Sequence, residues 1–165
     1  MMLGDIIFIG DDSWISKLIQ KYTDCPYSHV AIYIGNDKII EADYLGVIIS
    51  DIAKYNHCRL ARFSLHVAHA DLYKFIDFVL TQYNRKYDYS LLLGYLLVFT
   101  FNACKKYLGF FNCSDRWLCS ELVAAGMEHV NIKLPKSPQN MTPKDIYDFL
   151  KGQNYGEQQK NSKKM

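Results

Sequence analysis

One cysteine of this 165-residue chain stands where a thiol could be made reactive. Cys119 directly precedes the segment SELVAAGM, whose small and apolar residues are typical of a helix, so the cysteine falls at the expected helix start. The thiolate is the nucleophilic form of cysteine, and the positive end of a helix lowers the pKa of a thiol. Free cysteines are also among the most buried residues of proteins. Position alone leaves two interpretations of Cys119 open, a buried thiol and a nucleophile.

A histidine and a glutamate are predicted to face each other on two paired strands. The segments HVAIYIG and KIIEA are rich in β-branched residues and flank the turn sequence GND, which together predict a hairpin. With the turn near residues 35–37, His29 comes alongside Glu41, since facing positions on paired strands lie about 5 Å apart. A carboxylate beside an imidazole fixes its tautomer and raises its basicity, as a general base requires. An ordinary surface pair would have the same spacing, so both interpretations stay open.

The cysteine and histidine spacings do not indicate a bound metal ion. None of the five cysteines forms the C-x2-C pair of a structural zinc site, and the pair Cys25 and His29 stands alone. The sequence also lacks a Gly-rich phosphate-binding loop and a G-x-S-x-G nucleophile elbow. We therefore expect neither a metal nor a cofactor.

The order of the predicted elements places these residues in an α+β domain. Strand patterns dominate the first part of the chain, at GDIIFIG, HVAIYIG, KIIEA, GVIIS and CRLARFSL, with one early helix at SWISKLIQKY. Helical patterns follow at 70–83, 119–130 and 142–152. This order predicts a small antiparallel sheet or half-barrel with helices packed on one side. We expect a single domain over residues 1–150 and a disordered, polar and basic tail over 151–165.

The charge and the cysteine content limit which binding partners and which cellular compartment are expected. The formal net charge is +2, with the basic excess in the tail, which is not the basic stripe of a nucleic-acid-binding fold. The N-terminal segment has no basic region before an apolar run, and five cysteines without paired spacing fit a reducing compartment. We therefore expect a cytoplasmic protein that does not bind nucleic acid.

The apolar run at 91–104 is too short to cross a membrane. A spanning helix needs about 20 apolar residues, and this run ends at a pair of lysines. We expect either a buried core helix or an exposed apolar wall that binds an acyl chain or touches a membrane surface.

Four segments, taken in order, resemble a family of hydrolases. GDIIFIG, YSHVAIYIG, IIEA and LCSELVAAG, within roughly residues 3–130, resemble the circularly permuted branch of the NlpC-type papain-like cysteine hydrolases. That branch includes YiiX-like proteins and the lecithin:retinol acyltransferase-like enzymes. In it the histidine strand comes first and the cysteine helix near the end, as in this chain. The resemblance implies a permuted papain-like fold in which the sheet packs against the cysteine helix.

The resemblance also implies a role for each candidate residue. Cys119 matches the nucleophile, His29 the general base and Glu41 the third, orienting residue. In the acyltransferase-like subgroup the third residue is a second histidine, so the glutamate favours the YiiX-like side. Three further residues are expected in the substrate-binding cleft: Tyr87, Asp88 and Ser120.

The implied activity is cleavage of an amide bond in a peptide, a muropeptide or a related substrate through a thioester acyl-enzyme. Two alternatives stay open. The same three residues could serve an acyltransferase or a lipid-directed (thio)esterase, and the fold could also carry a non-catalytic binding module. Neither the implied activity nor the two alternatives imply a cofactor or an oligomeric partner.

Overall fold

The fold is built on one antiparallel sheet, seen in a computed structural model of the chain that describes residues 1–87, 116–153 and 157–160. The strands run in the order β4-β3-β2-β1-β5-β8. Their bounds are β1 (Ile6–Gly10), β2 (His29–Gly35), β3 (Lys38–Asp43), β4 (Gly46–Asp51), β5 (Arg59–Phe63) and β8 (Glu157–Lys160). A separate parallel pair joins the short strands β6 (Lys86–Tyr87) and β7 (Arg116–Trp117).

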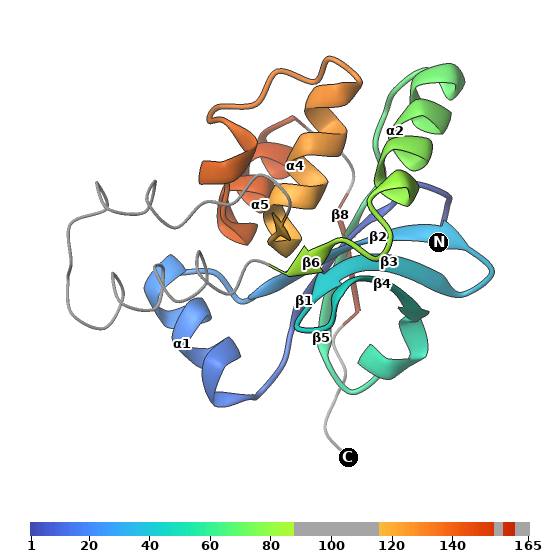
Figure 1. Cartoon of the computed structure of the whole chain (residues 1–165). Coiled ribbons are helices and arrows are strands. Elements are labelled where there is room, and N and C mark those ends of the chain that lie inside the picture. The colour runs from blue at the N-terminus through green and yellow to red at the C-terminus, as the bar shows by residue number, and fades with distance from the viewer. Residues whose placement is uncertain (88–115, 154–156, 161–165) are drawn as a thin grey trace.

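Three helices lie together on one side of this sheet (Figure 1). They are α2 (His69–Thr81), α4 (Cys119–His129) and α5 (Pro143–Gly152). Helix α1 (Trp14–Thr23) follows β1, and two 3-10 helices, η1 (Ile52–Tyr55) and η3 (Pro138–Asn140), complete the described elements. The predicted α+β class, with an antiparallel sheet packed against helices that include the cysteine helix, is confirmed.

Both faces of the sheet are buried, but by different neighbours. Along β1, Ile6 and Phe8 face the three helices, while Ile7 and Ile9 face a smaller cluster that includes Ile52 of η1. Alternate residues of a strand point to opposite faces, so a strand buried on both sides reads as a continuous apolar run. The sheet is therefore a central layer between the helices and the segment that follows β4.

The predicted start of α1 and that of α5 are confirmed by their capping contacts. The Ser13 hydroxyl accepts the Ser16 N–H at 3.2 Å and caps α1. At α5, Thr142 accepts the Asp145 N–H at 3.2 Å, and the Asp145 carboxylate accepts the Thr142 N–H at 2.9 Å. With a proline at the first helical position, these reciprocal bonds fix where α5 begins.

The β2–β3 hairpin forms where the sequence predicts it, but in a shifted register. Ile32 pairs with Ile40 and Tyr33 with Ile39, two residues away from the expected pairing, with an irregularity next to Gly35. The two turn residues Asn36 and Asp37 both have positive φ, as the tight turns of hairpins require. A shift of two residues leaves every side chain on its predicted face. His29 and Glu41 therefore remain on the same side of the hairpin.

A glycine allows α4 to lie close to α2. A Cβ added at Gly126 would lie 2.6 Å from the Phe75 ring and 3.0 Å from a methyl group of Val79. Both neighbours are fully buried, so neither has room to move away. The position of the cysteine helix thus depends on the absence of a side chain at residue 126.

The C-terminal segment differs from the disordered tail expected from residue 151. Helix α5 extends to Gly152, and residues 157–160 pair with β5 as the edge strand β8. Backbone pairing at a sheet edge needs no apolar side chains, so the polar sequence EQQK gives little sign of a strand.

The apolar run at 91–104 lies outside the described residues. Within the ranges that are described, no helix is long and apolar enough to cross a membrane.

Candidate active site

Cys119 is the first residue of α4 and lies beside the beginning of β2. Its N–H is one of the donors that a helix leaves unpaired in its first turn. The side chain is partly exposed, and α4 packs against β2, which brings the His29 ring near the sulfur. The charge of His29 and hydrogen bonding from its ring and from the backbone N–H groups of Val30 and Ser120 all act to lower the pKa of Cys119. The predicted nucleophile and the predicted base are therefore neighbours.

These surroundings favour the thiolate form of Cys119. Burial alone raises the pKa of a thiol, because it disfavours the charged form. The positive charge of His29, its hydrogen bond and the two backbone N–H groups outweigh burial and hold the pKa of Cys119 below its ordinary value of 9.0. Cys25 shows the opposite balance: burial outweighs the backbone hydrogen bond from Tyr27 and the charge of Lys144, and its pKa is raised.

His29 is held at the rim of the sheet by its backbone. It is the first residue of β2 and pairs with Ile9 of β1. The loop before it passes so close to β1 that a Cβ at Gly10 would lie 2.1 Å from the Pro26 carbonyl oxygen. The preceding residue, Ser28, is buried, and its hydroxyl bonds that of Ser16 at 2.5 Å. The backbone that carries the imidazole is therefore held in one position.

The ring of His29 lies between two negative groups. Its Nε2 is 2.7 Å from Oε2 of Glu41, which leaves Nδ1 to face the sulfur of Cys119. Burial alone lowers the pKa of His29, but the Cys119 thiolate and then the Glu41 carboxylate raise it to about 10. Each group therefore favours the charged form of the other, a thiolate beside an imidazolium.

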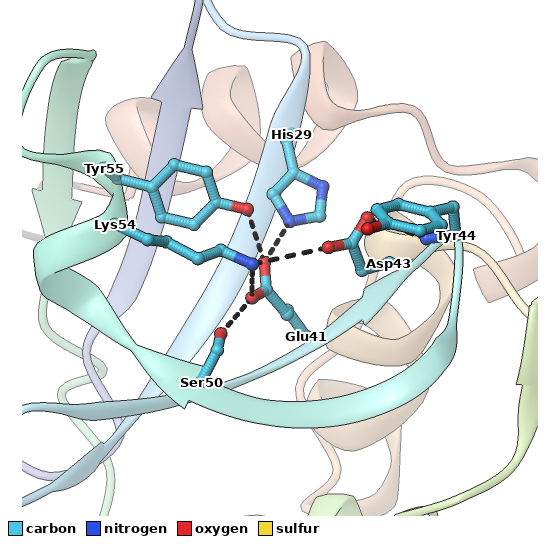
Figure 2. Close-up of polar contacts among 7 residues, drawn as sticks. All are labelled: His29, Glu41, Asp43, Tyr44, Ser50, Lys54 and Tyr55. Carbon is cyan, nitrogen blue, oxygen red and sulfur yellow. Dashed lines mark hydrogen bonds and ion pairs between the residues drawn. The ribbon is translucent and has the colours of Figure 1, made fainter.

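Glu41 lies at the centre of a polar network (Figure 2). Its side chain is 0% exposed, yet both carboxylate oxygens are bonded. Oε2 accepts hydrogen bonds from His29 and from the Tyr55 hydroxyl at 2.7 Å. Oε1 accepts the Ser50 hydroxyl and lies 2.6 Å from the ammonium group of Lys54. Burial raises the pKa of a carboxyl group, but these partners, His29 first, lower that of Glu41 to about 2.

Three members of this network were not predicted from the sequence. Ser50 lies in β4, while Lys54 and Tyr55 lie in the short η1 that follows it. A 3-10 turn of four residues has no periodic pattern to reveal it. One signal was present: a glutamate inside an apolar strand needs a cationic or hydrogen-bonding partner when buried. That signal indicates that a partner exists and does not identify it.

The predicted substrate-binding residues have different surroundings. The Ser120 side chain is buried, and its hydroxyl donates to the Met141 carbonyl at 2.6 Å, so the group that faces the site is its backbone N–H. The backbone of Tyr87 pairs with Trp117, two residues before Cys119. Asp88 lies outside the described residues. A substrate-binding role for all three stays a prediction.

An open groove of about 500 Å³ lies next to the network. Its walls include Lys54 and Tyr55, which contact Glu41, and Asp43, which pairs with Lys54. The remaining lining residues are Asp11, Asp12, Ser13, His57 and Cys58. The groove presents charged and hydroxyl groups beside the candidate site.

Within the described residues, no three His, Cys, Asp or Glu side chains are grouped as a metal site requires. Both ring nitrogens of His29 are engaged, one with Glu41 and one with Cys119. These residues do not fit a metal-ligand set, and no metal enters the chemistry considered below.

Comparison with known proteins supports the fold. No protein-family model matches the chain, and no curated protein matches its sequence. Five chains of solved structures match it. One is the crystal structure of a metalloprotein, yiiX, from Escherichia coli O157:H7, with a TM-score of 0.60 and 18% sequence identity over 82% of this chain and 69% of that chain. The chain therefore has a YiiX-like fold.

Proposed function

We propose that the chain is a cysteine hydrolase that cleaves an amide bond through a thioester acyl-enzyme. The observation that carries the proposal is the position of His29 at the start of β2, bonded to Glu41 on one side and next to Cys119 at the start of α4 on the other. A nucleophile, a base in contact with it and a group that orients the base are the three parts of a covalent hydrolase site. The chain order, histidine strand first and cysteine helix later, agrees with the permuted papain-like family that the sequence resembles.

The first half of the reaction uses groups already in place. The Cys119 thiolate attacks the substrate carbonyl carbon, a C–S bond forms, and one electron pair moves onto the carbonyl oxygen. In this proposal the backbone N–H groups at the start of α4 stabilise that oxyanion. The C–N bond then breaks, and the imidazolium of His29 gives its Nδ1 proton to the leaving nitrogen. A thioester and a neutral imidazole remain.

The second half returns the site to its starting state. The neutral His29 ring takes a proton from water, and the oxygen attacks the thioester carbonyl. The C–S bond breaks, the carboxylic acid product leaves, and the thiolate again faces an imidazolium. Glu41 keeps Nε2 engaged throughout, so Nδ1 is the nitrogen that exchanges the proton.

The charged side chains of the groove support an amide substrate that carries polar groups, such as a peptide or a muropeptide. Three carboxylates and one ammonium are among its lining groups.

The first test is the rate of Cys119 alkylation by iodoacetamide as a function of pH. Because the pKa of Cys119 is lowered, we expect it to react at pH 6 at least about tenfold faster than a free thiol. Buried Cys25 and Cys58 serve as internal controls, because burial raises the pKa of both. A Cys119 that reacts no faster than a free thiol would contradict the proposal.

The second test is trapping of the acyl-enzyme by intact-mass analysis with peptide, muropeptide and lipid substrates. We expect an adduct on the wild-type chain from an amide substrate and none on the Cys119→Ala variant. An adduct that persists in the variant would show that the covalent chemistry lies elsewhere. Product analysis with an added amine separates hydrolysis, which yields the free acid, from acyl transfer, which yields the new amide.

A further inference from the structure

Lys54 forms an ion pair with the carboxylate that orients the base. Its ammonium group lies 2.6 Å from Oε1 of Glu41 and 3.3 Å from Asp43. It reaches Glu41 from η1, next to the Tyr55 side chain (Figure 2). Glu41 is completely buried, whereas about a third of the Lys54 side chain is exposed. The buried charge at Glu41 is thus shared between an imidazolium on one oxygen and an ammonium on the other.

This arrangement bears on the release of a proton from His29. In the proposed reaction the ring gives up its Nδ1 proton while Cys119 is losing its negative charge to the substrate. A buried carboxylate with no other cation would hold that proton on the ring, because an opposite charge nearby favours the charged form. A second cation on the same carboxylate weakens this attraction.

The other neighbours of Glu41 do not supply a charge. Ser50 and Tyr55 are neutral donors, and burial, followed by the charge of Glu41, raises the pKa of Tyr55, so its hydroxyl stays protonated. Lys54 also lies 4.8 Å above the Tyr55 ring, a cation–π contact that helps to hold both side chains. The charged or titratable groups that act on His29 and Lys54 from all neighbouring elements are Asp11, Glu41, Asp43, Tyr55 and Cys119.

We propose that Lys54 is a positioning residue that offsets the charge of Glu41, so that His29 is oriented by a carboxylate yet remains able to release its proton. The proposal rests on the proposed function of the site. It assigns Lys54 an effect on the acidity of His29, with no contact to substrate.

The test is NMR titration of His29 in a chain labelled with ¹³C-histidine and carrying Cys119→Ala. Removing the thiol removes the largest contribution that raises the pKa of His29, which brings the titration into an accessible range. The His29 signal is the one absent from a His29→Asn variant. Adding Lys54→Met removes a like charge near the ring, so we expect the pKa of His29 to rise by about one unit.

A matched control is Lys38→Met in the same Cys119→Ala chain. Lys38 lies in β3, the strand that also carries Glu41. It pairs with Asp51 at 2.7 Å and has no ion pair with Glu41. We expect this control to leave the pKa of His29 unchanged. Lys54→Gln, which removes the charge but keeps a hydrogen-bond donor, should match Lys54→Met and provides a second variant if the methionine chain does not fold.

The outcomes separate this inference from the proposed function. An unchanged or lowered pKa of His29 in both Lys54 variants would overturn the role of Lys54, and so would an equal rise in the Lys38 control. The titration uses chains without the nucleophile and needs no catalysis. A failure of the alkylation and trapping tests would instead remove the hydrolase function, whatever the titration shows.

Discussion

At the residue scale, the lowered pKa of Cys119 depends mainly on a single neighbouring ring. His29 supplies both the charge and the hydrogen bonding that offset burial at the sulfur. A helix N-terminus contributes less, typically less than about 1 kcal/mol at a partly exposed position. The acidity of the thiol therefore depends more on where β2 begins than on its place at the start of α4.

The variant His29→Ala tests this dependence. With the ring gone, burial dominates and the pKa of Cys119 rises toward or above its ordinary value of 9.0. The thiol is then protonated at pH 6, and we expect its alkylation rate there to fall by about tenfold or more. The matched control is His129→Ala, at the opposite end of α4, where the ring stacks on Phe78 at 4.6 Å. A similar loss in the control would show a general effect on α4.

The sequence identified His29 and Glu41 but missed three partners of Glu41: Ser50 in β4, and Lys54 and Tyr55 in the short η1. The period of two along β2 and β3 was enough to put His29 and Glu41 on one face, even though the exact register was off by two residues. Nothing comparable placed Cys119 next to His29, because that contact depends on how a helix docks on a sheet. The resemblance to permuted papain-like hydrolases supplied this pairing.

At the element scale, the decisive contact is the one between α4 and α2. Strand and helix positions followed from apolar periodicity and from capping residues such as Ser13 and Thr142. The close approach of α4 to α2 could not be predicted in this way, because a glycine in a helical sequence can be present for several different reasons. The structure shows the cause at Gly126: the Phe75 ring occupies the space of a side chain.

Gly126→Ala should therefore destabilise the protein. Replacing glycine in a helix gains about 1 kcal/mol in helix propensity, but overpacking a closed core costs about 1–3 kcal/mol. We expect the free energy of unfolding in urea denaturation to fall by up to about 2 kcal/mol, the difference between these two effects. Gly152→Ala, where a Cβ would meet nothing within 4 Å, should leave stability unchanged or slightly higher. Equal stability of the two variants would mean that α4 can shift without loss.

At the scale of the whole molecule, the site joins two parts of the chain that are far apart in sequence. The proposed base and its partners lie close together in the sequence, on consecutive elements from β2 to η1: His29, Glu41, Ser50, Lys54 and Tyr55. The nucleophile comes from α4, after all but one strand of the main sheet. Contacts between residues close in sequence form sooner in folding than contacts across long loops.

Refolding experiments can detect this order. We expect amides of β2 and β3 to gain protection from hydrogen exchange before Cys119 gains its fast alkylation at pH 6, when both are followed by pulse labelling after dilution from denaturant. Cys119→Ala provides the unlabelled reference. Fast alkylation that appears together with, or ahead of, amide protection in β2 and β3 would contradict a late arrival of the nucleophile.

The position of the cysteine helix late in the chain has a consequence during synthesis. Proteins emerge from the ribosome with the N-terminal part first. A nascent chain would therefore carry a formed hairpin, with its histidine and glutamate paired, while the thiol was still untranslated or not yet docked. The ring and the sulfur can meet only after α4 has been synthesised and has docked on the sheet, so until then the thiol lacks the charge that lowers its pKa.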